Sequence, residues 1–167
     1  VSAAQLNAIA AATTGKVTAT LSSDTPLNAA TVTALKDVKT TDDIAFESSA
    51  EVLNSVEAFN ALLAINKIIS GADFTAVATI TAAAADVALV KEVLKYVEAT
   101  VAVTINGEIS AADASAIAQD SVLTATIKAG SVAATLKAIK DVQTTDFITF
   151  KTTDKSADAS ELVALAA

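Results

Sequence analysis

The chain of 167 residues contains no cysteine, histidine, methionine or tryptophan, and its eleven basic residues are all lysines. These absences remove thiol nucleophiles, imidazole acid/base relays and Cys/His zinc sites. They also remove the guanidinium group, which holds phosphate or carboxylate at two points. Only carboxylates and lysines remain for chemistry, so we expect a protein that is not an enzyme and that carries no cofactor.

Aromatic residues and positive charge are also scarce. Five phenylalanines and one tyrosine leave the core to be built from Ala, Val, Leu and Ile. The net charge is −8, and the lysines stand singly along the chain, so we expect no nucleic-acid partner, since phosphate binding needs clustered positive charge. Polar residues interrupt every apolar run before it could span a bilayer, which predicts no membrane insertion. The chain begins at Val1, which we interpret as a sign of processing or of excision from a longer protein.

The clearest positive feature is an internal repeat. LKDVKTTDDIAF begins at Leu35 and IKDVQTTDFITF at Ile139, and eight of the twelve paired positions are identical. VSAAQLNAIA at Val1 returns as ISAADASAIA at Ile109, and VTATL at Val17 returns as LTATI at Leu123. These matches predict a single repeat array over residues 1–167, with related units at about 1–49 and 109–153 and degenerate units at about 50–108.

The repeat is interpreted as alternating strands and helices. The predicted strands start about one helix apart, so successive strands should be parallel and joined by right-handed crossovers. They cover Val17–Ser22, Asp43–Glu47, Thr75–Thr81, Thr100–Asn106, Val122–Lys128 and Phe147–Thr152. The repeated motif would then carry the last turn of a helix, a Thr-Thr-Asp turn that bonds the local backbone, and the inward Ile and Phe of the next strand.

Helix starts are marked by side-chain caps. Ser2, Ser48 and Ser110 each precede an acidic or amide residue at the third following position, which is typical of an N-cap. Pro26 is suited to the first turn of another helix. A further helix is predicted over residues 82–99, with a buried face formed by Val87, Val90, Leu94 and Val97.

The strand faces distinguish two α/β architectures. Val17, Ala19 and Leu21 alternate with Thr18 and Thr20, and the strands near residues 101 and 123 alternate in the same way. One apolar and one threonine-rich face favour a right-handed βα repeat solenoid, with a parallel sheet and helices mainly on one side. The alternative is a compact α/β domain with a parallel six-stranded sheet, whose ligand would lie at the carboxyl ends of the strands.

Two groups of residues are candidate sites. Asp42, Asp43 and Asp146 are weak calcium candidates, with Asp37 and Asp141 one helical turn earlier, because Ca²⁺ takes oxygen ligands. The sequence contains no loop of the known calcium-binding kinds, so we favour stabilisation of the turns as their role and predict that no metal is bound. A surface formed by threonines is the second candidate, either as an adhesive face or as an ice-binding-like array; its members are Thr18, Thr20, Thr79, Thr104, Thr124 and Thr126.

An acid/base or Schiff-base site is less favoured. Glu47, Lys128 and Lys151 fall at predicted strand ends, where charges usually maintain solubility. The four glycines are isolated, so no phosphate-cradling loop is present. We therefore assign no catalytic and no cofactor-binding residues.

The segments SAAQLNAIAAATTGKVTATL and SAADASAIAQDSVLTATI resemble the Ala/Thr/Asp-rich helix–strand repeats of very large secreted bacterial and cyanobacterial proteins. In those proteins such repeats often accompany RTX-type calcium repeats and type I export. The resemblance implies an extracellular or cell-surface location and partners among neighbouring repeats or matrix components. The expected function is a non-catalytic structural or adhesive module of a larger protein; a small ligand-binding or enzymatic α/β domain is the alternative.

Overall fold

The structure is a computed structural model that describes residues 1–22, 24–46, 52–69, 71–72, 74, 77–97, 100–156 and 158–166. Helices and strands alternate along most of the chain. The helices are α1 (Ala3–Ala12), α2 (Ala29–Ala34), α3 (Val56–Ile68), α4 (Val87–Val93), α5 (Ala111–Ala118), α6 (Val132–Ala138) and α7 (Ala159–Ala166), and α4 is flanked by the short 3-10 helices η1 (Ala84–Asp86) and η2 (Leu94–Tyr96). The strands are β1 (Thr18–Thr20), β2 (Asp43–Ala45), β3 (Val52–Leu53), β4 (Thr79–Ala83), β5 (Ala102–Ile109), β6 (Val122–Gly130) and β7 (Phe147–Thr152).

The strands form parallel sheets whose order follows the sequence. One sheet pairs β1 with β2, and a five-stranded sheet has the order β3-β4-β5-β6-β7. Every recorded strand pair is parallel. Residues 47–51, between β2 and β3, lie outside the described part of the chain. The prediction of an α/β protein with a parallel sheet is therefore confirmed.

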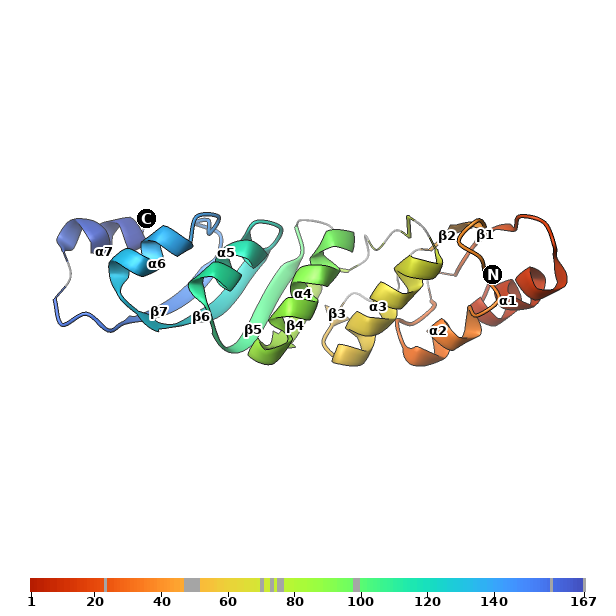
Figure 1. Ribbon diagram of the computed structural model, residues 1–167, viewed down its shortest axis with the longest axis horizontal. Coiled ribbons are helices and arrows are strands. Elements are labelled where there is room, and N and C mark those ends of the chain that lie inside the picture. The colour runs from red at the N-terminus through yellow and green to blue at the C-terminus, as the bar shows by residue number, and fades with distance from the viewer. Residues whose placement is uncertain are drawn as a thin grey trace.

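The helices follow the same linear order as the strands. Each helix packs on the next one along the chain, from α1 against α2 to α6 against α7. Figure 1 shows the elements succeeding one another along the longest axis, with α3 to α6 in front of the five-stranded sheet. The N-terminal and C-terminal units lie at opposite ends of the molecule (Figure 1). Neighbouring elements in space are thus largely neighbours in sequence.

The strand faces agree with the predicted alternation. Val17 and Leu21 are buried while Thr18 and Thr20 are exposed. The same pattern holds in the larger sheet, where the buried positions are Val101, Val103, Ile105, Leu123, Ala125 and Ile127. These side chains belong to one continuous apolar core that also contains the inward helix positions. The core therefore lies between the sheets and the helices packed on them.

Two of the three predicted serine caps are present at helix starts. The Ser2 hydroxyl accepts from the Gln5 N–H and the Gln5 side chain accepts from the Ser2 N–H, which completes a capping box. Ser110 caps α5 by accepting from the Asp113 N–H at 3.0 Å. The predicted cap of Ser48 with Glu51 lies outside the described residues, and α3 begins instead after Ser55.

Several predicted boundaries are wrong. Pro26 does not lie in the first turn of a helix. The N-cap of α2 is Asn28, whose side chain accepts a backbone hydrogen bond, so the helix begins only at Ala29. The predicted helix over 82–99 starts later, since β4 continues to Ala83 and α4 covers only Val87–Val93. The short strand β3 was not predicted, because two residues give no measurable alternation. Thr75, at the start of the third predicted strand, lies outside the described residues, and β4 begins at Thr79.

A bulge in β5 explains one glycine. The register between β5 and β6 shifts between Thr104 and Glu108, and Gly107 in this interval has a φ of 102°. A side chain there would be strained, and its Cβ would also approach the Ala84 Cβ to 3.1 Å. Glycine is thus required where the strand bends toward η1.

Candidate functional site

The threonine face is divided between the two sheets. Thr18 and Thr20 lie on β1, whereas Thr79, Thr104, Thr124 and Thr126 lie on the five-stranded sheet. Within the larger sheet the register aligns Thr81 with Thr104 and Thr104 with Thr124. Adjacent strands are about 4.8 Å apart, so these three side chains form one regular row across β4, β5 and β6.

Other candidate threonines fall outside this row. Thr79 is paired with Ala102, and Thr126 with Glu108 and Thr149. At β7 the row ends on Phe147, which is paired with Thr124 and is 70% exposed. The sheet therefore presents a single threonine row bordered by an aromatic side chain, and not a two-row array.

The two turn aspartates make equivalent bonds in the two copies of the repeat. Asp42 accepts from the Val17 N–H at 3.0 Å and from the Lys39 N–H at 2.9 Å. Asp146 accepts from the Leu123 N–H and the Gln143 N–H, both at 2.7 Å. One bond closes the local turn, as predicted, and the other holds the start of the preceding strand. Each carboxylate therefore links two successive strands of the array.

The backbone bonds also explain the acidity of Asp42. Donation from the Val17 N–H, followed by donation from the Lys39 N–H, holds the pKa of the Asp42 carboxyl below its usual value of 3.8. The neighbouring Asp43 makes a different contact, an exposed ion pair with Lys16 at 3.6 Å. The described residues contain no group of three or more acidic side chains placed to hold one metal ion. The absence of a bound metal stays a prediction, and these aspartates stay weak calcium candidates.

A second set of equivalent bonds joins neighbouring helices. Asn7 of α1 exchanges two hydrogen bonds with Asp37, since its amide donates to the carboxylate at 2.8 Å and its oxygen accepts from the Asp37 N–H at 2.7 Å. Ser115 of α5 does the same with Asp141, at 2.9 Å for both bonds. Asn7 and Ser115 were not among the site residues predicted from the sequence. The sequence did contain a signal for them. The two residues occupy the same position when the two copies of the repeat are aligned, and both side chains can donate and accept a hydrogen bond.

A charged cluster at the start of α5 was also not predicted as a unit. Lys91 of α4 lies 2.6 Å from Asp113, whose other oxygen accepts from the Ser110 hydroxyl at 2.7 Å. The Lys91 ammonium and then the Ser110 hydroxyl lower the pKa of Asp113. Because the Ser110 hydroxyl is also occupied as the N-cap, this cluster fastens α4 to α5 and offers no free nucleophile.

The remaining acid/base candidates are not brought together by the described part of the structure. Lys128 on β6 and Lys151 on β7 are both exposed. Glu47 lies outside the described residues. The prediction of no catalytic residues is left as a prediction, and no described cluster argues against it.

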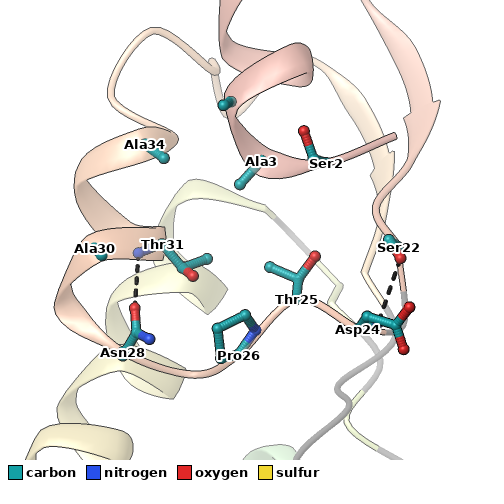
Figure 2. Close-up of a pocket in the computed structure, with 11 residues that line it drawn as sticks. Ser2, Ala3, Ser22, Asp24, Thr25, Pro26, Asn28, Ala30, Thr31 and Ala34 are labelled. Carbon is teal, nitrogen blue, oxygen red and sulfur yellow. Dashed lines mark hydrogen bonds between the residues drawn. The ribbon is translucent and has the colours of Figure 1, made fainter.

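Two shallow hollows along the helix layer are lined by described residues. The first, of about 380 Å³, lies between the start of α1, the loop after Ser22 and helix α2 (Figure 2). Two of its polar side chains accept hydrogen bonds from nearby backbone groups. The Ser22 hydroxyl accepts from the Asp24 N–H, and the Asn28 side chain accepts from the Thr31 N–H (Figure 2). The second hollow, also about 380 Å³, lies between α2 and α3 and includes Glu57, which accepts from the Ala29 N–H. Neither hollow gathers several carboxylates or lysines.

None of the described helices is both long and apolar enough to cross a bilayer. Comparison of the chain with protein-family models, curated proteins and solved structures gives no match.

Proposed function

We propose that this chain is a non-catalytic structural or adhesive repeat module, built as a right-handed βα solenoid and belonging to a larger secreted or cell-surface protein. The observation that carries the proposal is how the repeated polar residues are used. Asp42 and Asp146, and the pairs Asn7–Asp37 and Ser115–Asp141, all join one unit to the next. Duplicated residues that serve assembly are typical of stacked repeats.

The linear arrangement supports the same proposal. Helices contact the next helix in the sequence, and the sheet order has no inversion, so contacts are mostly between neighbouring units. An inversion of strand order is what creates a ligand crevice in a doubly wound α/β domain. Its absence from the two recorded sheets favours the module over the alternative of a compact ligand-binding or enzymatic domain.

The surface offered by the module is the sheet face with the threonine row. Thr81, Thr104 and Thr124 are aligned on neighbouring strands, and Phe147 extends the row. Hydroxyl groups at regular spacing beside an aromatic ring suit polysaccharide or matrix surfaces through hydrogen bonds and ring stacking. Ice binding is less well supported, because a single short row provides only a small regular lattice.

An attachment assay tests the adhesive role. Beads coated with the chain should be retained, saturably, on one or more surfaces in a panel of immobilised polysaccharides and matrix proteins. The double variant Thr104→Lys, Thr124→Lys should lose most of this retention because it replaces the centre of the row. The matched control is Ala116→Lys, at an exposed position of α5, and it should leave retention unchanged.

Failure of retention on every surface contradicts the adhesive role. Equal retention of the double variant and the parent contradicts the assignment to the threonine face. Saturable binding or turnover of a small molecule would favour the compact-domain alternative.

A further inference from the structure

The bulge of β5 contains an asparagine followed by a glycine. The sequence has six asparagines, and Asn106 alone is followed by glycine. Asn106 and Gly107 are both exposed, while Ile105 before them is buried. Glycine has no Cβ, so the backbone nitrogen that follows the Asn106 side chain is not shielded by a side chain of its own. The side-chain amide and an open backbone nitrogen are thus neighbours in the bulge.

The hydrogen-bonding pattern of β5 leaves the Gly107 N–H outside the regular ladders. The Ala102 N–H donates to the Ala78 oxygen at 3.0 Å, so the even-numbered residues of β5 bond toward β4. The odd-numbered residues then bond toward β6, where the recorded register stops after Thr104 and resumes at Glu108. Gly107 falls in this interval, and a bulge leaves its extra residue unpaired. The regular ladder of neither neighbouring strand therefore holds this N–H.

The backbone conformation explains why glycine occupies this position. The φ of Gly107 is 102°, which a residue with a side chain rarely adopts. A Cβ at this position would also lie 3.1 Å from the Ala84 Cβ. The bulge thus requires, directly after Asn106, the residue type that shields the backbone nitrogen least.

We propose that Asn106 is a site of spontaneous deamidation, in which the Gly107 backbone nitrogen attacks the Cγ of the Asn106 side chain. A bond forms between this nitrogen and Cγ, the bond from Cγ to Nδ2 breaks, and ammonia leaves with the proton that the Gly107 nitrogen loses. A water molecule then opens the resulting cyclic imide at one of its two carbonyl carbons. Opening at one carbon gives aspartate. Opening at the other gives isoaspartate, in which the main chain runs through the former side chain.

Either product changes the outer face of the five-stranded sheet. Asn106 follows Thr104 by two residues, with the buried Ile105 between them, so both belong to the outer face. The new carboxylate adds one negative charge beside the threonine row, in a chain whose net charge is already −8. Isoaspartate also adds a methylene group to the main chain where Asn106 pairs with Ala83 of β4. None of these steps depends on the stacking of units.

Incubation of the folded chain at mildly alkaline pH, followed by acidic digestion and mass spectrometry of the peptides, tests the reaction. The peptide with Asn106 should gain the mass that separates an amide from a carboxylic acid, and it should appear as both aspartate and isoaspartate. Conversion should be faster at higher pH, because the attacking nitrogen must lose its proton. Asn60 is the internal control, since it is exposed on α3 and precedes alanine. It should remain an amide while most of Asn106 is converted.

Two comparisons separate the role of the residue from that of the bulge. Asn106→Gln keeps an amide at this exposed position, but its cyclisation needs a larger ring, so conversion should be lost while the circular dichroism of the parent is retained. The parent unfolded in urea reports the reactivity that the residue pair has without the fold. Folded Asn106 should be converted at a comparable rate, because the bulge leaves the Gly107 N–H outside the ladders.

Three results overturn the proposal. The first is that Asn106 stays an amide in the folded chain while it is converted in urea, since the fold would then protect it. The second is equal conversion of Asn60 in the folded chain. The third is formation of aspartate without isoaspartate, which indicates direct attack by water in place of the Gly107 nitrogen. The adhesive role is tested separately, because bead attachment is measured on freshly purified chain.

Discussion

At the scale of residues, the turn aspartates of the repeated motif stabilise the structure by accepting hydrogen bonds from backbone N–H groups. The Asp42 carboxylate accepts one hydrogen bond within its own turn and one from the N–H of Val17, the residue just before β1. A hydrophobic residue could fill the same space but could not receive two N–H groups at once. The same arrangement at Asp146 explains why both copies of the repeat have aspartate at this position.

The stabilisation from Asp42 should depend on pH. Its folded pKa lies below 3.8, so its contribution is fully present above that value and is lost as the pH falls through the folded pKa. We expect Asp42→Asn to unfold at lower urea concentration than the parent at pH 7, with the difference shrinking as the pH is lowered below about 4.

Asp43→Asn is the control for this measurement, because it removes only an exposed ion pair, a kind of contact of small energy. Its urea midpoint at pH 7 should remain close to that of the parent. A difference between Asp42→Asn and the parent that persists unchanged at pH 3 would contradict the role of the carboxylate.

At the scale of elements, the two copies of the repeated strand occupy different environments. β2 is followed by further units whose Phe74 packs against Phe46, whereas β7 is the last strand of its sheet. The same inward pattern of Ile and Phe is therefore fully covered in one strand and partly covered in the other. Sequence similarity between the strands does not make them energetically equal.

Truncating the matched phenylalanines should measure this difference. Phe46→Ala removes a fully buried ring and should lower the free energy of unfolding by about 3 to 5 kcal/mol. Phe150→Ala removes a partly covered ring and should cost about 1 to 2 kcal/mol. Urea unfolding of the two variants checks the prediction, and equal losses would contradict it.

At the scale of the whole molecule, the linear order of elements decides how far a perturbation spreads. Helices and strands contact mainly their sequence neighbours, and β1-β2 and β3-β4-β5-β6-β7 are recorded as separate sheets. If the units stack as proposed, the free energy of unfolding is roughly a sum over units and their interfaces, so a weakened unit can open while distant units stay folded.

Hydrogen exchange on Phe46→Ala tests this property. Amide protection should fall by the largest factor in α1, β1, α2 and β2, and should be retained in β5 and β6, which lie several units away. The Ile9→Glu variant, in which a surface residue is changed, is a suitable control and should keep the parent's pattern. A uniform loss of protection over the whole chain would indicate one cooperative core and would contradict the solenoid.

The sequence by itself determined the features that depend on local geometry. Alternation of apolar and threonine residues, with a period of two, placed Val17, Leu21 and their counterparts on the inner face of parallel strands. The caps at Ser2 and Ser110 followed from side chains that reach backbone only three residues away. These features could be predicted because side-chain direction and short-range hydrogen bonding are set by the residue and its near neighbours.

Only the tertiary structure decided what depends on distant segments. It showed that Asp42 reaches Val17, that Asn7 and Ser115 hold the next unit, and that the threonines align in one row. It also separated Ile9 from Ile117, two aligned isoleucines in nearly identical sequence. Burial and register depend on the segments that lie next to a residue, so the same residue type can be buried in one copy of the repeat and exposed in the other.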